Sequence, residues 1–182
     1  MLYTRKGDKG DTYFFESKDR FSKSGERAEA LGALDELNSL LGLCKTKARE
    51  TDIKIEGHTL PHILEQVQQN LFIVQAALAG APKEIGQDKV DFLEKIIDSI
   101  EKQLPEIKTF FLAGGTDLSA LLDYTRAVSR RAERRVIGYL ETEKVEVKPE
   151  IRSYLNRLSS LLYALVRLVN LKSGIQEVPP SY

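Results

Sequence analysis

Ten residues in the second half of the chain carry an unusual density of positive charge. The segment from Arg126 to Arg135 contains five arginines and one glutamate. The side chains that would share one face of a helix are Arg126, Arg130, Glu133 and Arg134. Like charges four residues apart repel along a helix, and one glutamate can offset only one arginine. Such a face either stays in water or meets a strongly anionic ligand.

The rest of this segment predicts how the helix would be placed. Arg131 and Arg135 fall on the adjoining stripe. The expected apolar back of the helix consists of Ala127, Val128, Ala132 and Val136. A helix of this kind would pack on a core and present its arginines outward.

The N-terminal segment is rich in groups that can donate hydrogen bonds to phosphate. Residues 4–12 hold two glycines, two hydroxyl side chains and three cations. Glycines let backbone N–H groups converge, and the neighbouring side chains add further donors. The segment lacks the Gly-Lys-Ser/Thr of a P-loop, so an ordinary charged N-terminal arm explains it about as well.

Composition excludes several classes of function. Lys plus Arg and Asp plus Glu both number 27, so a general nucleic-acid binder is not expected. Cys44 is the only cysteine, which rules out an internal disulfide and a cysteine-based zinc site. No apolar run could span a bilayer, and the N-terminus lacks the apolar stretch of a signal peptide. A cytoplasmic protein without membrane contact is the expectation.

The chain offers no motif for a protein nucleophile or a metal centre. His58, His62 and Glu65 are conceivable ligands, but neither histidine follows a glutamate by three residues. No Ser-His-Asp or Cys-His arrangement is indicated. The nucleophile of any reaction would therefore come from a substrate or cofactor, and the protein would supply positioning and charge neutralisation.

Hydrophobic periodicity predicts five helices and no convincing strand. The expected helices cover about residues 26–47, 60–78, 88–104, 118–140 and 149–172. Asp88 and either Thr116 or Asp117 are candidate N-caps, and Pro61 and Pro149 suit first helical turns. The prediction is a single all-α domain over residues 1–182. It would be a five-helix bundle of the ferritin-like, four-helix-bundle type with an extra helix.

Within this domain, residues 1–25 would form an arm, residues 26–172 the bundle and residues 173–182 a tail.

Four segments together resemble the PduO-type ATP:cob(I)alamin adenosyltransferases. They are residues 3–10 (YTRKGDKG), 29–39 (EALGALDELNS), 126–135 (RAVSRRAERR) and 154–159 (YLNRLS). They occur in the family's order, and the likeness extends beyond residue 170. The resemblance implies a homotrimer with sites between adjacent subunits, where Co(I) of cobalamin attacks the 5′-carbon of ATP. The products would be adenosylcobalamin and triphosphate, with Mg²⁺ on the phosphates. A reductase and a cobalamin-dependent acceptor enzyme would be possible partners.

The resemblance also assigns roles to individual residues. The residues implied to bind ATP are Thr4, Arg5, Gly7, Lys9, Gly10, Thr12, Lys23, Arg130, Glu133, Arg134 and Asn156. Among them, Arg130 resembles the principal phosphate arginine. Asp35 and Arg126 resemble an intersubunit ion pair beside the corrin, and Phe110 resembles an aromatic that faces the corrin and helps displace its lower axial ligand. The residues implied to be catalytic are Arg130, Asp35, Arg126 and Phe110.

Three positions depart from the family pattern and leave alternatives open. Lys6 and Asp11 stand where small or hydroxyl residues are common, and Ala113 stands where a proline often precedes the glycine pair. A second hypothesis is therefore a non-catalytic trimer that binds ATP and corrinoid and delivers cobalamin to a partner enzyme. A third is a structural helical protein whose arginine face is only solvated.

Overall fold

The computed structural model describes residues 3–13 and 20–181. Five helices account for most of these residues, which confirms the mainly helical prediction. They are α1 (Glu26–Ala48), α2 (Leu60–Leu78), α3 (Gln87–Glu101), α4 (Asp117–Thr142) and α5 (Pro149–Lys172). Among the described residues, no helix is both long enough and apolar enough to cross a lipid bilayer.

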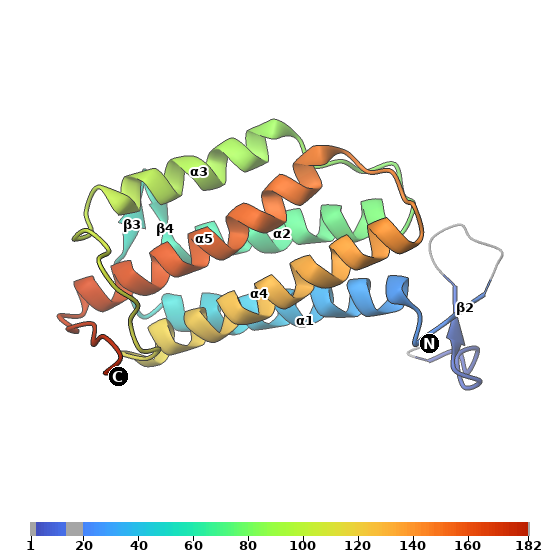
Figure 1. The fold of residues 1–182 in the computed structure, drawn as a ribbon, viewed down its shortest axis with the longest axis horizontal. Coiled ribbons are helices and arrows are strands. Elements are labelled where there is room, and N and C mark those ends of the chain that lie inside the picture. Colours follow the sequence, from blue (N-terminus) through green and yellow to red (C-terminus); the bar gives the residue numbers. More distant parts are fainter. Residues whose placement is uncertain (1–2, 14–19, 182) are drawn as a thin grey trace.

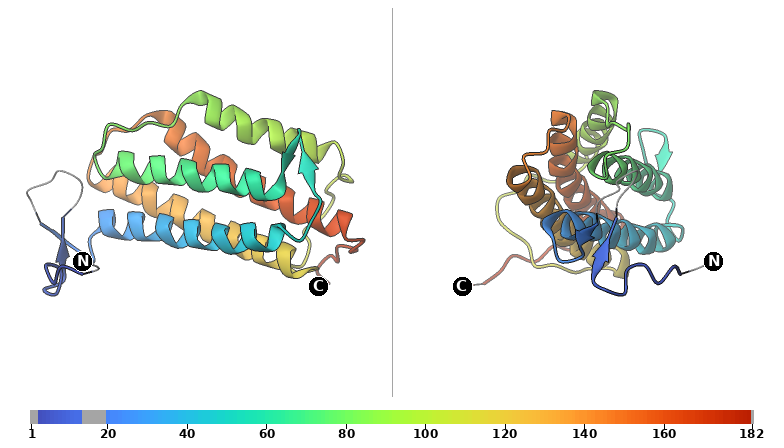
Figure 2. Two further views of the ribbon diagram at one scale, coloured as in Figure 1. Left: turned by 180° about the vertical axis from the view of Figure 1, so that it is seen from behind. Right: turned by 90° about the vertical axis from the view of Figure 1, so that its right-hand side faces the viewer.

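The helices lie side by side and form an elongated body (Figure 1). Helix α1 packs against α2 and α4, and α5 packs against α4 and α3. We call residues 102–116, which connect α3 to α4, the Phe110 loop. This loop crosses one end of the body, where the C-terminal tail also lies (Figures 1 and 2). The N-terminal arm projects from the opposite end, beside the start of α1.

Apolar residues at helical spacing form the core. The spacing of Leu34, Leu37 and Leu41 on α1 and of Leu64, Val67 and Leu71 on α2 buries one stripe of each helix. Helix α5 is buried around much of its circumference because it packs against α3 and α4 and also meets α2. Buried polar contacts also cross the core: Asn70 Nδ2 donates to the Tyr154 hydroxyl oxygen at 3.2 Å, and Cys44 Sγ lies 3.2 Å from Thr125 Oγ1.

The helix starts differ in their capping: α2 and α4 have a side-chain cap, whereas α1, α3 and α5 have none. Thr116 caps α4, its hydroxyl accepting from the Ser119 N–H while the Ser119 hydroxyl accepts from the Thr116 N–H. Prolines occupy the first turns of α2 and α5, as predicted. The prediction of Asp88 as a cap is wrong, because α3 begins one residue earlier and Gly86 holds the N-cap position.

Two short hairpins contradict the expectation of no strands. One pairs β1 (Asp11–Thr12) with β2 (Phe21–Ser22), and the other pairs β3 (Lys54–Ile55) with β4 (His58–Thr59). All four strands are two residues long, which is too short to produce a period-two pattern in the sequence. The first hairpin organises the N-terminal arm.

Candidate functional site

The arginines of α4 face two different sides: Arg131 and Arg135 face α1, whereas Arg126 and Arg130 face a pocket. Arg131 forms an ion pair with Glu36 of α1, and Arg135 Nη2 lies 4.0 Å from Glu29 of the same helix. Their positive charge is therefore largely offset within the chain. Three members of the predicted apolar back, Val128, Ala132 and Val136, are buried. The prediction for Ala127 is wrong, because this residue is exposed.

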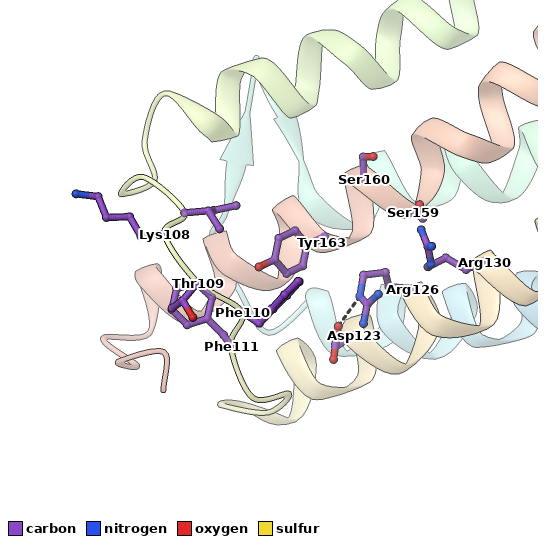
Figure 3. A pocket seen from close by; sticks show the side chains of 11 residues that line it. Lys108, Thr109, Phe110, Phe111, Asp123, Arg126, Arg130, Ser159, Ser160 and Tyr163 are labelled. Atoms are coloured by element: carbon purple, nitrogen blue, oxygen red, sulfur yellow. Dashed lines mark hydrogen bonds and ion pairs between the residues drawn. The ribbon is translucent and has the colours of Figure 1, made fainter. Parts of the chain in front are cut away.

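Arg126 and Arg130 point the other way, into a pocket of about 560 Å³. The pocket lies between the Phe110 loop, α4 and α5 (Figure 3). The residues that line it are Ile107, Lys108, Thr109, Phe110, Phe111, Asp123, Arg126, Arg130, Ser159, Ser160 and Tyr163. One wall is thus cationic and another is apolar and aromatic, so the pocket suits a ligand that carries both an anionic and an extended apolar part.

The two pocket arginines differ in their electrostatic surroundings. Arg126 Nε donates to Asp123 Oδ1 at 2.6 Å within α4, which fixes its guanidinium and offsets its charge. Arg130 is exposed and has no carboxylate partner within residues 3–13 and 20–181. Arg130 is therefore the pocket arginine best able to neutralise an incoming anion.

Phe110 forms the exposed part of the apolar wall. Its side chain is 79% exposed, and Ile107 and Leu112 of the same loop are also exposed. Figure 3 shows the Phe110 ring beside Tyr163 of α5, on the same side of the bundle as Arg126. Exposed apolar side chains gathered at a pocket mark a ligand-binding or partner-binding surface.

Farther along α4, a polar network links three helices. Asn156 Nδ2 of α5 donates to Glu133 Oε1 at 3.2 Å, so two residues that the resemblance assigns to the nucleotide do meet. Arg157 Nη1 donates to Asn156 Oδ1 at 2.9 Å, and Arg157 Nε donates to Glu94 Oε1 at 2.7 Å. The network fixes the orientation of the Asn156 amide. Sequence reasoning missed Arg157 and Glu94, although Arg157 lies inside a quoted motif.

Arg134 extends this face of α4 by one further position. Its Nη1 donates to the backbone oxygen of Arg130 at 3.0 Å, and its side chain is exposed. The guanidinium is therefore held close to the turn that carries Arg130.

The N-terminal arm is folded into a compact turn. Gly10 has a φ of +83°, and its N–H donates to the Gly7 carbonyl oxygen at 3.2 Å. Lys23 closes the turn twice, because its N–H donates to the Gly10 oxygen at 2.9 Å and its Nζ donates to the Gly7 oxygen at 2.8 Å. Residues 1–2 and 14–19 of the arm lie outside the described residues.

Asp11 has a local partner. Arg20 Nη2 donates to Asp11 Oδ1 at 2.6 Å and also reaches the Lys6 carbonyl oxygen. The hydrogen bond from Arg20 lowers the pKa of the Asp11 carboxyl below its ordinary value of 3.8. The negative charge that departs from the family pattern is therefore matched within the arm.

The structure brings together only part of the predicted site. Phe110, Arg126 and Arg130 share one pocket. The arm lies off the opposite end of the bundle (Figure 1). From Arg130 to the last residue of α4, Thr142, the helix rises by about 18 Å. Asp35 is exposed on α1, and its side chain makes no ion pair in the described parts of the chain.

The two histidines do not assemble a metal centre. His58 of β4 stacks on His62 of α2 with ring centroids 5.3 Å apart, and Phe92 packs edge-on against His58. Across the described residues, no three His, Cys, Asp or Glu side chains gather as metal ligands. The contact therefore has the geometry of aromatic packing between α2, α3 and the second hairpin.

Comparison with known proteins identifies relatives of the whole chain. The family model described as cobalamin adenosyltransferase matches residues 2–169. A corrinoid adenosyltransferase of Bacillus subtilis is 37% identical over 181 residues, covering 97% of this chain and 90% of the relative. The corrinoid adenosyltransferase PduO of Citrobacter freundii is 38% identical over 173 residues, and the chain spans about half of that relative (49%).

A solved structure shares the fold over its full length. It is a variant PduO-type ATP:corrinoid adenosyltransferase from Lactobacillus reuteri, complexed with cobalamin and ATP. Its TM-score with this chain is 0.87 at 29% sequence identity, and the likeness covers 100% of both chains.

Proposed function

Because the chain belongs to the cobalamin adenosyltransferase family, we propose that it transfers the 5′-deoxyadenosyl group of ATP to the Co(I) centre of a corrinoid. The products are adenosylcobalamin and triphosphate. The observation that carries the proposal is the pocket in which Arg130, an arginine with no carboxylate partner among the described residues, stands close to the exposed aromatic wall of Phe110. One wall suits phosphate and the other suits the face of a corrin.

The reaction explains why the chain carries no nucleophilic motif. The Co(I) electron pair attacks C5′ of ATP, a Co–C bond forms, and the C5′–O bond breaks. The electrons of the broken bond leave with triphosphate, which must be stabilised as its charge develops. Fixed cations and backbone donors are suited to that task, and no protein group has to form a covalent intermediate.

We assign the phosphate-stabilising role to Arg130. Its guanidinium lines the pocket, and the arm would supply further donors to the triphosphate from the Gly7 N–H and the Lys23 ammonium, in a turn that Gly10 shapes. Glu133 and Asn156, which hold each other, would orient the nucleoside part of ATP. Mg²⁺ would enter with ATP, because phosphate oxygens are the hard ligands this ion prefers.

We assign the corrin-facing role to Phe110 and Arg126. An aromatic ring placed under the macrocycle would displace the lower axial ligand, which eases reduction of Co(II). A reductase must supply the electron, so a reductase and an acceptor of the product are expected partners.

We infer that each site is completed by a second copy of the chain in a homotrimer. The inference is supported by the separation of the arm from the pocket, since the arm cannot cover its own Arg130 from the far end of α4. The exposed Asp35 of one copy would then pair with Arg126 of the next. Asp123 already holds Arg126 in a fixed orientation for that contact.

The test is product formation by the purified chain with ATP, Mg²⁺ and chemically reduced cobalamin. The expected result is adenosylcobalamin, seen by its absorbance, with one triphosphate per product. Binding of both substrates without product would instead support the non-catalytic delivery protein. Absence of binding as well as product would contradict the proposed function.

A further inference from the structure

A buried arginine of α5 holds together two segments that lie outside the helices. The Arg167 side chain is only 3% exposed. Its Nε donates to Glu177 Oε2 of the C-terminal tail at 2.9 Å, and its Nη2 donates to the Pro105 carbonyl oxygen of the Phe110 loop at 3.2 Å. Its guanidinium carbon also lies 5.3 Å from the ring centroid of Phe111.

The same two segments are joined by backbone contacts. The Leu112 N–H donates to the Val178 carbonyl oxygen at 2.9 Å. Asn170, one turn after Arg167 on α5, donates from Nδ2 to the Gly114 carbonyl oxygen at 3.4 Å. The Phe110 loop is thus tied to α5 and to the tail on both sides of Phe110. We call the contacts of Arg167 together with the Leu112–Val178 hydrogen bond the latch.

The burial of Arg167 makes the latch cooperative. A guanidinium removed from water is costly unless its charge and its N–H groups find partners. Here the counter-ion comes from the tail, while the carbonyl and the aromatic face come from the loop. Because Arg167 is satisfied only when both segments are in place, release of either one leaves a buried charge unpaired.

We propose that Arg167 is a positioning residue for corrinoid binding: through Glu177 and Pro105 it locks the tail onto the Phe110 loop and so sets the position of the Phe110 ring. The inference rests on the proposed function for its ligand, while the latch itself does not depend on turnover. Phe111, which Arg167 contacts, adjoins Phe110 in the chain and lines the same pocket. The core of the bundle is built from other residues, so we expect loss of the latch to change the position of the loop and to leave the bundle intact.

The first test is the Arg167→Met variant, which keeps the length of the side chain and removes its charge. Hydrogen exchange at the Leu112 amide should become about tenfold faster. The Kd for cob(II)alamin should rise about tenfold, while the Kd for ATP stays within about twofold. Arg167→Lys should recover part of the corrinoid affinity, because it restores the charge without the planar fork.

A matched pair of variants separates positioning from general stability. Glu177→Gln removes the tail's counter-ion, whereas Glu84→Gln breaks an ion pair with Lys148 that lies away from the loop, before the start of α5. Only Glu177→Gln should weaken corrinoid binding. We expect local opening of the loop and tail to hydrate its unpaired Arg167, so the bundle helices should unfold within a few degrees of the parent in both variants. An unchanged Leu112 exchange rate in Arg167→Met would overturn the latch. Faster exchange with unchanged corrinoid affinity would overturn its positioning role.

The two proposals fail in different ways. If the unmodified chain binds no cob(II)alamin, the proposed function is contradicted, and the exchange measurement still decides whether the latch exists. If it binds cob(II)alamin normally and Arg167→Met binds it equally well, the positioning role alone is contradicted.

Discussion

Arg130 is distinguished from the other arginines of α4 by what surrounds it. Arg126, Arg131 and Arg135 each have a carboxylate partner, and Arg134 is held by a backbone oxygen. Arg130 faces the pocket and has no carboxylate partner among the described residues. The density of charge in the sequence could not distinguish these arginines from one another. The groups that pair with them come either from α1 or from the preceding turn of α4.

Replacing Arg130 with alanine should therefore remove transition-state stabilisation without affecting the fold. We expect kcat/KM to fall by about a hundredfold or more, the range seen when one preorganised donor to a developing charge is lost. Arg152→Ala, an exposed arginine of α5 away from the pocket, should be near-neutral. Steady-state rates with saturating reduced cobalamin measure this, and equal rates for the two variants would remove Arg130 from the site.

Gly115 is a second residue whose environment decides its role. Its φ is +121°, and a Cβ at this position would lie 2.2 Å from Asn170 Oδ1 and 2.9 Å from Ser119 Oγ. The glycine pair that follows Ala113 thus includes a place of close approach between the Phe110 loop and α5. The pinning by Asn170 also bears on Ala113, since it holds the loop without the proline common at that position.

Gly115→Ala should destabilise the chain by about 1–3 kcal/mol, because it adds both a strained backbone and a clash. Gly138→Ala is the matched control. Gly138 lies within α4, and a Cβ added there would meet nothing within 4 Å, so alanine should stabilise the chain by about 0.5–1 kcal/mol. Chemical denaturation measures both values, and equal stability for the two variants would contradict the close contact.

Single residues also show where sequence reasoning stopped. The last helix reads as a regular apolar seam, and this masked Arg167. A lone arginine within an apolar stretch of a buried helix was the available signal, because such a charge requires dedicated partners. Those partners, Glu177 and Pro105, lie in segments without periodicity, so only the structure identifies them.

The long secondary-structure elements could be predicted from the sequence, whereas the short ones could not. The five helices carry long apolar repeats and were predicted within a few residues of their ends. The four strands are too short to repeat, and their hairpins depend on turn geometry and on side-chain contacts. The arm is the clearest case, because Asp11 reads as a misplaced negative charge until its pair with Arg20 is seen.

The negative charge of Asp11 suggests that removing it would strengthen ATP binding. The structure of the arm hairpin predicts the reverse. Asp11→Asn should lower ATP affinity several-fold, because it loosens the arm that carries the proposed phosphate donors. Asp8→Asn removes the same charge from the arm without breaking the pair with Arg20, and it should leave affinity unchanged or slightly raised. Calorimetry of ATP binding measures this, and tighter binding by Asp11→Asn would show that repulsion of the triphosphate dominates.

The lowered pKa of Asp11 fixes the pH range over which the pair acts. Its stabilisation of the arm is fully present above the ordinary value of 3.8 and is lost only as the pH falls through the lower value in the folded arm. The contribution of this pair to ATP affinity should therefore be constant between about pH 5 and 8. A change in the effect of Asp11→Asn across that range would contradict the assignment.

The whole molecule places the two proposed sets of phosphate donors at different positions along its length. The arm and the Phe110 loop, which borders the pocket, stand at opposite ends of the bundle (Figures 1 and 2). An isolated chain in this arrangement cannot close the arm over its own pocket. A ring of copies could do so, with the arm of each copy serving the next, and closed rotational symmetry would give every copy an equivalent site.

Mixed assemblies provide the most direct measurement of this account. One variant carries Lys9→Ala and Lys23→Ala in the arm, the other carries Arg130→Ala, and each alone should form little adenosylcobalamin. After co-refolding at equal amounts, about a quarter of the sites should combine an intact arm from one copy with an intact Arg130 from another. Recovery of about a quarter of the parent rate is the predicted result. A mixture no more active than either variant alone would contradict a site shared between copies.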